Sequence, residues 1–142
     1  MRTAAEILQH KGRTVHAVQP VDTVLHALGV MAAHEIGAVL VMEEERLCGI
    51  LTERDYARRV VLMGRASRSS AVADVMTPHV VCVSPDRSVD ECMALMTDRR
   101  VRHLPVLDRK VVVGLISIGD VVKATIADHE FTISQLQSYI AG

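Results

Sequence analysis

The order of apolar and polar positions predicts a chain of alternating short strands and helices. Three short apolar runs are typical of strands: 79–84 (HVVCVS), which is rich in β-branched residues, 103–108 (HLPVLD) and 111–117 (VVVGLIS). Residues 85–100 lie between the first two runs, and their apolar side chains recur at helical spacing: Val89, Cys92, Met93 and Met96. We therefore expect a helix there whose apolar stripe packs against a sheet.

The first half of the chain predicts the same order of elements. The expected elements are a strand at 14–19, a helix at 22–35, strands at 38–43 and 47–52, and a helix at 53–63. In the second half, the strands at 103–108 and 111–117 form a β-ribbon that turns at Asp108 to Lys110, and a further helix begins at 118–127. Both halves read strand, helix, strand, strand, helix, which predicts a mixed α/β (α+β) fold.

An internal repeat accounts for this duplication. Adding 65 to a residue number in the first half maps Val15 onto Val80, Pro20 onto Pro85, Met31 onto Met96, Gly49 onto Gly114 and Asp55 onto Asp120. Further upstream, 4–8 (AAEIL) echoes 72–76 (VADVM), with about three extra residues around Lys11 to Arg13. A unit of about 55 residues is marginal alone, so we expect two tandem β-α-β-β-α repeats packed as one pseudo-twofold module.

The repeat divides the chain into four segments. We assign 8–63 to the first repeat, 64–73 to a polar, glycine-containing linker, 74–128 to the second repeat and 129–142 to a C-terminal helix. The last segment places Ile133, Leu136 and Ile140 at helical spacing. We expect this terminal helix to dock on the body of the protein or on a second subunit.

Charge and composition exclude several kinds of partner. The 142 residues have a formal net charge of -1, no Trp, one Phe and two Tyr. The chain therefore lacks both the basic field and the aromatic stacking platforms of a nucleic-acid-binding protein. No apolar run approaches the ~20 residues of a membrane span, and the N-terminus lacks the apolar core of a signal peptide. We expect a soluble cytoplasmic protein.

The candidate chemistry lies in a short motif that both repeats carry. In 49–56 (GILTERDY) and 114–121 (GLISIGDV) a strand ends at a hydroxyl residue, and an aspartate follows three positions later. The start of a helix exposes unpaired N–H groups and favours anions such as phosphate. The aspartate oxygens can accept hydrogen bonds from both hydroxyls of a ribose.

The same motif also has a purely structural interpretation. A Thr or Ser that begins a helix, with an acid at the third helical position, is a variant of the capping box and contributes about 1 kcal/mol without any ligand. Capping and ligand binding are compatible, so both interpretations of Thr52–Asp55 and Ser117–Asp120 stay open.

Taken together, these residues resemble a pair of CBS domains, the regulatory module named after cystathionine beta-synthase. The resemblance covers about 15–127 and is most specific in the second copy, where 101–106 (VRHLPV) and 117–122 (SIGDVV) fit the family pattern. The first copy has 36–41 (IGAVLV), which lacks the usual proline. The chain is also similar to small stand-alone bacterial CBS-pair proteins and to the CBS region of inosine monophosphate dehydrogenase, without the catalytic barrel of that enzyme.

The resemblance implies adenine nucleotide binding in up to two clefts between the repeats. For one cleft it implies phosphate and ribose contacts by the first motif, an adenine-lining pair of valines and a cationic pair near phosphate: Thr52, Arg54, Asp55, Val80, Val81, Arg102, His103 and Pro105. For the other cleft it implies Ser117, Asp120, Val15, His16, Gly37 and Ala38. Because Gly37-Ala38 corresponds to Arg102-His103, we expect the second cleft to lack a cation pair and to differ in affinity or ligand.

The expected function is therefore a non-catalytic regulatory module with no catalytic residue and no metal. Its ligand would be AMP, ADP, ATP or NAD, and it would sense energy state, form a homodimer through its helices and signal to an unknown target protein. One alternative is a purely structural dimerisation module with empty clefts. An enzyme with a Cys82 or Cys92 nucleophile is the other, but both thiols fall at expected core positions, and Cys48, Cys82 and Cys92 form no Cys-x-x-Cys pair.

Overall fold

The computed structural model describes residues 2–141, which form two compact units. The first unit is the continuous segment Val15–Val80. The second joins the N-terminal residues up to Thr14 to the part of the chain from Val81 onward. Each unit has its own apolar core, and each is described separately below.

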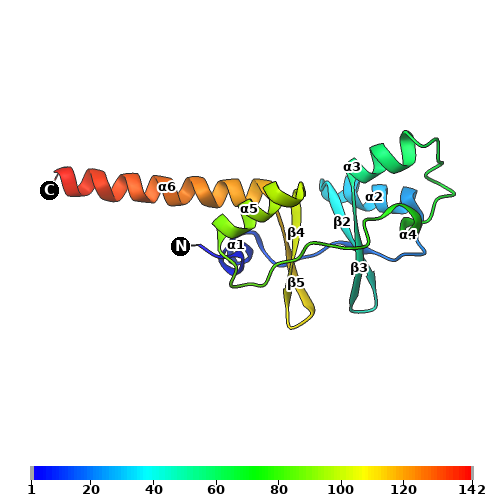
Figure 1. Cartoon of the computed structure of the whole chain (residues 1–142), viewed down its shortest axis with the longest axis horizontal. Helices are drawn as coiled ribbons and strands as arrows, with labels where there is room; N and C mark the ends of the chain where they lie inside the picture. The colour runs from blue at the N-terminus through cyan, green and yellow to red at the C-terminus, as the bar shows by residue number, and fades with distance from the viewer. Residues whose placement is uncertain (1, 142) are drawn as a thin grey trace. The chain divides into compact units, whose positions relative to one another are not determined.

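The continuous unit is a small sheet covered by helices (Figure 1). Its strands are β1 (Ala17–Val18), β2 (Ala38–Glu43) and β3 (Arg46–Thr52), in the order β1-β2-β3, with β1 parallel and β3 antiparallel to β2. Its helices are α2 (Val24–His34), α3 (Glu53–Asp55), the π-helical turn η1 (Tyr56–Val61) that continues α3, and α4 (Val72–Val75). The core joins residues of α2, such as Met31, to Val39, Val41 and Leu51 of the sheet.

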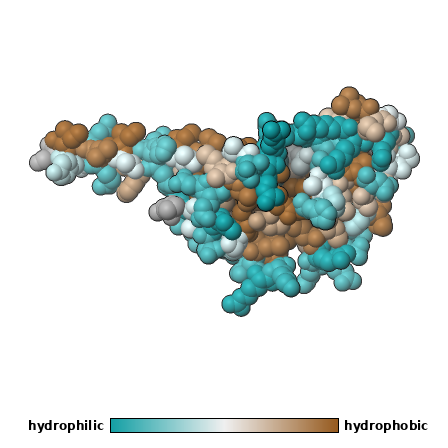
Figure 2. Space-filling view, viewed as in Figure 1, coloured by the Kyte–Doolittle hydropathy of each residue, from teal (hydrophilic) through white to brown (hydrophobic). Residues whose placement is uncertain are grey.

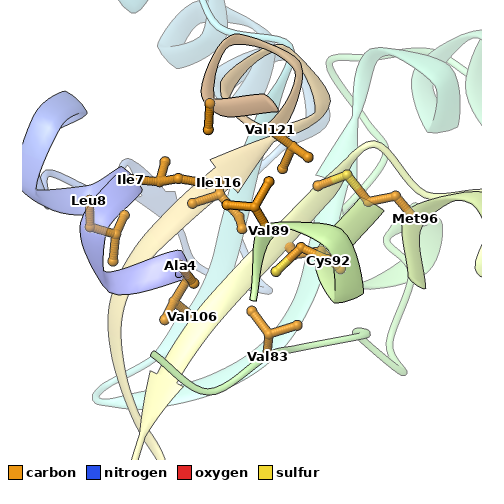
Figure 3. Packing of buried hydrophobic residues seen from close by; sticks show 12 residues of the cluster. Ala4, Ile7, Leu8, Val83, Val89, Cys92, Met96, Val106, Ile116 and Val121 are labelled. Atoms are coloured by element: carbon orange, nitrogen blue, oxygen red, sulfur yellow. The ribbon is translucent and has the colours of Figure 1, made fainter. Parts of the chain in front are cut away.

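The second unit is built on a β-hairpin. Its strands are β4 (His103–Asp108) and β5 (Val111–Ser117), and its helices are α1 (Ala4–Lys11), α5 (Val89–Arg99) and α6 (Ile118–Ala141). The two residues of the turn, Arg109 and Lys110, have φ of 51° and 70°, as a tight two-residue hairpin requires. Figure 3 shows the core of this unit, where side chains of α1, α5 and α6 meet those of the hairpin.

The mixed α/β fold class and the apolar stripe of α5 are confirmed. Val89, Cys92 and Met96 are buried in the core of their unit, and Met93 packs against it. Ser88 caps the helix in a capping box with Glu91, and Arg100 ends it in the left-handed conformation. The expected β-ribbon with its turn before Val111 is confirmed as well.

The expected strand at 79–84 is wrong, and Pro105 gives the reason. Among residues 79–84, only Val83 pairs with β4. Its N–H donates to the Pro105 carbonyl at 3.0 Å, and its carbonyl accepts from the Leu107 N–H at 2.9 Å. The next bond of this parallel ladder would need an N–H at position 105, which proline lacks. In the first repeat the corresponding residue is Leu40, whose N–H donates to the His16 carbonyl at 3.1 Å. Even there, the expected strand at 14–19 shortens to Ala17–Val18.

The C-terminal segment also differs from the expectation. Residues 129–141 are not a separate helix, because α6 runs without a break from Ile118 to Ala141. This part of α6 does not dock on its own unit, since Figure 1 shows it extending away from α1 and α5, and its side chains from His129 to Ile140 are exposed.

The two compact units divide the chain differently from the sequence repeats. The helix that opens the first repeat, α1, packs on β5 and α6 of the second repeat. The helix that opens the second repeat, α4, packs on β3 and η1 of the first. The repeat boundaries at 8–63 and 74–128 are sequence units and stay a prediction.

Candidate functional site

The motif of the continuous unit forms a complete capping box. Thr52 ends β3 and Asp55 lies in the first turn of the helix that follows. Asp55 Oδ2 accepts hydrogen bonds from the Thr52 N–H at 3.0 Å and the Thr52 hydroxyl at 3.1 Å, and the Asp55 N–H donates to Thr52 Oγ1 at 3.1 Å. The other carboxylate oxygen, Oδ1, accepts a long bond of 3.4 Å from the Thr77 hydroxyl. One oxygen of Asp55 therefore serves the cap, while the other accepts a weak bond from a neutral hydroxyl.

The motif of the second unit has the same cap and an additional cation. Asp120 Oδ2 accepts the Ser117 N–H at 2.8 Å, and the Asp120 N–H donates to Ser117 Oγ at 3.2 Å. Lys11 Nζ lies 2.6 Å from the same Oδ2 and donates to the Leu115 carbonyl at 2.9 Å. Burial by itself raises the pKa of Asp120, but the bonds from Lys11 and Ser117 and the Lys11 charge outweigh it and lower that pKa.

Each unit brings its motif next to one of the two strand starts that the resemblance assigns to the sites. In the continuous unit, Ala38 is the register partner of Thr52, and the Glu53 N–H donates to the Gly37 carbonyl at 3.0 Å. In the second unit, His103 is the register partner of Ser117, and the Ile118 N–H donates to the Arg102 carbonyl at 2.9 Å. The resemblance pairs each motif with the strand start of the other repeat, and that pairing stays a prediction.

The remaining predicted site residues lie near the ends of strands and helices. Val15 and His16 precede β1, and the His16 ring stacks on the His34 ring with centroids 3.7 Å apart. Arg54 is exposed on α3. Val80 and Val81 are half-buried on either side of the boundary between the units, and Pro105 is buried in β4.

Sequence reasoning missed two residues that touch the motif aspartates, Lys11 and Thr77. Lys11 ends α1, and Thr77 follows α4 closely. The echo of 4–8 in 72–76 was the available signal, because it places the residues after each short helix at comparable positions in the two repeats. It does not show which aspartate each segment reaches, because Lys11 and Asp120 are 109 positions apart.

The side chains of the described residues offer little to the enzyme alternative. Burial raises the pKa of the Cys82 thiol and of the Cys92 thiol, which disfavours the thiolate that a nucleophile requires. Within residues 2–141, no group of three or more His, Cys, Asp or Glu side chains is arranged to hold a metal ion. No helix in the same range has the length and apolar character needed to cross a bilayer.

Comparison with known proteins identifies the family. The family model of the CBS domain matches residues 2–62 and 72–127. A solved putative signal-transduction protein with CBS domains from Burkholderia ambifaria is 52% identical, with a TM-score of 0.87, over 89% of this chain and 96% of that one. The mitochondrial CBS domain-containing protein CBSX3 of Arabidopsis thaliana is 38% identical over 99% of this chain and 72% of its own length.

Two further relatives extend this picture. Inosine-5′-monophosphate dehydrogenase of Methanocaldococcus jannaschii is 34% identical over 78% of this chain, which spans 22% of that enzyme. A CBS domain pair with 21% identity and a TM-score of 0.78, over 87% of this chain and 99% of that one, was solved with 5′-methylthioadenosine and S-adenosyl-L-methionine. Because the family model covers most of the chain in two matches, this protein belongs to the CBS domain family as a tandem CBS pair, a regulatory module.

Proposed function

We propose that this CBS pair is a non-catalytic sensor whose hydroxyl-x-x-Asp motifs bind adenosine-containing nucleotides. The observation that carries the proposal is which oxygen of each motif carboxylate accepts the hydrogen bonds of the helix cap. Oδ2 of Asp55 and of Asp120 completes a helix cap. Oδ1 of Asp55 accepts the long 3.4 Å bond from Thr77, while the cap bond and the Lys11 ammonium of Asp120 both meet Oδ2. A carboxylate oxygen with free lone pairs is a ready acceptor for a ribose hydroxyl.

The surroundings of the motifs support an anionic, phosphate-bearing ligand. Thr52 and Ser117 are each followed by the first turn of a helix, and the positive end of the helix dipole favours an anion such as phosphate there. Arg54 is exposed one residue before Asp55. The adenosine compounds bound by the CBS pair with 5′-methylthioadenosine and S-adenosyl-L-methionine support an adenosine moiety here. Between AMP, ADP, ATP and NAD the choice is left to experiment.

The experiment is a thermal-shift panel with AMP, ADP, ATP, NAD, S-adenosylmethionine and GMP. A ligand at ~100 times its dissociation constant adds about 2.7 kcal/mol, which raises the melting temperature by several degrees. Asp55→Asn and Asp120→Asn should each remove one binding event. Shifts with adenosine compounds but not GMP support the sensor.

A matched control separates binding from capping. Ser88 and Glu91 form the same capping box on α5, with the Glu91 N–H donating to Ser88 Oγ at 3.1 Å. Glu91→Gln should lower the melting temperature to a similar extent as the motif variants but leave every ligand shift intact. If no compound stabilises the nucleotide-free protein, the purely structural dimerisation module is the better account.

The second part of the proposal is a homodimer that signals to a target protein in the cytoplasm. Along α6, six positions alternate in steps of four and three residues, as in the seam of a coiled coil: Val122, Ile126, His129, Ile133, Leu136 and Ile140. Their side chains are exposed, and Figure 2 shows apolar side chains along the projecting part of the helix. In a dimer, the same seam on the α6 of a second copy would pack against this seam and cover it.

A further inference from the structure

The two motif aspartates differ in the side chain that reaches them from outside the motif. Asp55 receives a neutral hydroxyl, that of Thr77, at 3.4 Å. Asp120 receives a cation, Lys11 Nζ, at 2.6 Å. Both partners come from the end of a short helix or the residues that follow it, and these helices echo each other in the sequence. The two repeats therefore use comparable segments to bring different donors, a hydroxyl and an ammonium, to equivalent carboxylates.

Lys11 is held in this position by its surroundings. It is the last residue of α1, whose Ile7 and Leu8 are buried in the core of the same unit. Its ammonium also donates to the Leu115 carbonyl at the end of the hairpin. The Asp120 side chain is 18% exposed and the Lys11 side chain 37% exposed, so the pair is partly withdrawn from water. A charge-assisted bond in this setting is stronger than a neutral one.

At Asp120 the Lys11 ammonium occupies Oδ2, the same oxygen that completes the cap. Binding of the diol by both carboxylate oxygens requires Oδ2 to exchange a charged donor for a neutral one, and it leaves a partly buried ammonium without its counter-ion. At Asp55 the printed donors are neutral: Oδ2 accepts from Thr52 and Oδ1 accepts a long bond from the Thr77 hydroxyl, so the same change costs less.

We propose that Lys11 is an intrachain competitor for ligand at the Ser117–Asp120 motif and sets the order in which the two motifs fill. This inference rests on the proposed function. Nucleotide binds first at Thr52–Asp55, and the Asp120 motif fills only when Lys11 leaves the carboxylate. The specificity of the second motif for its ligand is then determined by a residue of α1, outside the motif itself.

The test measures ADP binding by isothermal titration calorimetry in an Asp55→Asn background, where the Asp120 event is observed alone. Lys11→Met removes the ammonium but keeps a similar apolar stem, and it should tighten this event by about tenfold, equivalent to ~1.4 kcal/mol. Lys11→Arg keeps the cation and should leave binding weak. Lys123→Met removes a charge from an exposed position on α6 and controls for net charge.

Asp120→Asn in the same background identifies the part of the binding heat that depends on the Ser117–Asp120 motif. Lys11→Gln provides a second neutral variant if Lys11→Met does not fold. Weaker or unchanged ADP binding in both neutral variants would overturn the inference, and a weakening would mean that Lys11 contacts phosphate instead. The absence of any Asp120-dependent event in these variants also overturns it. The proposed function fails separately, when the chain with Asp55 intact binds no nucleotide either.

Discussion

Leu8 packs so closely on Gly114 that the glycine has no room for a side chain. A Cβ at position 114 would lie 2.5 Å from Leu8 Cδ2 and 2.6 Å from Cδ1. Gly49 leads the other motif and shows the same relationship, since its Cβ would lie 2.6 Å from Met76 Sδ and 2.8 Å from the Thr77 carbonyl oxygen. The glycine before each motif thus allows a short helix, or the residues just after it, to approach the strand that carries the motif.

Replacing either glycine should therefore destabilise its unit. Gly114→Ala and Gly49→Ala force closely packed neighbours apart, and overpacking of this kind costs about 1–3 kcal/mol. Gly49→Ala should be the worse of the two, because one neighbour is a backbone carbonyl that cannot rotate away. Urea unfolding gives both values. Gly29→Ala is the control, since position 29 on α2 faces open space and alanine there favours the helix. Equal stability of all three variants would contradict this packing account.

The Lys11–Asp120 pair predicts a dependence of stability on pH. The folded-state pKa of Asp120 is lowered, so the folded protein binds this proton less readily than the unfolded chain. The stabilisation is present above the unfolded-state pKa of about 3.9 and is lost as the pH falls through the lower folded-state pKa. The difference in unfolding free energy between wild type and Asp120→Asn should accordingly shrink between neutral pH and about pH 3.

Urea unfolding at several pH values measures this difference. The pKa of Asp86 and that of Glu91 are also lowered, by hydrogen bonds from Ser84 and Ser88 respectively, but these groups are the same in both proteins and cancel. A constant difference across the whole pH range would show that the Asp120 carboxylate has the same pKa in the folded and unfolded states.

The seam on α6 predicts that one charge will separate the proposed dimer. Leu136 is 57% exposed near the end of the helix, and Leu136→Asp would place a carboxylate in a seam that a second copy buries. Sedimentation velocity at micromolar concentration should show a dimer for wild type and a monomer for this variant. Ser138→Asp, on the opposite side of α6, should remain dimeric. A wild-type protein that sediments as a monomer would rule out this dimer.

Pro105 predicts a gain of one backbone hydrogen bond. In Pro105→Ala the new N–H at position 105 faces the segment before Val83. The corresponding N–H in the first repeat, that of Leu40, donates to the His16 carbonyl. We expect this amide to donate to the Val81 carbonyl and to exchange slowly with solvent in amide hydrogen exchange followed by NMR. Rapid exchange of this amide, in a variant that is otherwise folded, would mean that something other than the proline ends the ladder.

Much of each unit could be predicted from local patterns. The spacing of Val89, Cys92 and Met96 predicts the buried face of α5, and the alternation around Asp108 to Lys110 predicts the hairpin. The strand at 79–84 could not be judged in this way, because its β-branched residues favour a strand while a proline on a neighbouring strand withholds the partner N–H. A pattern within one segment carries no information about the hydrogen-bonding groups of its neighbour.

The sequence by itself determined the repeat, most of the helices and strands, and the position of a hydroxyl and an aspartate at the start of a helix in each copy. These follow from spacing within a few residues, which local hydrogen bonding and side-chain periodicity control. Tertiary structure alone decided that α1 lies in the unit of the second repeat, and therefore that Lys11 meets Asp120 while Thr77 meets Asp55. The physical reason is that the packing of Leu8 on Gly114 and of Met76 on Gly49 selects the partner of each short helix, and such contacts join residues that no local pattern connects.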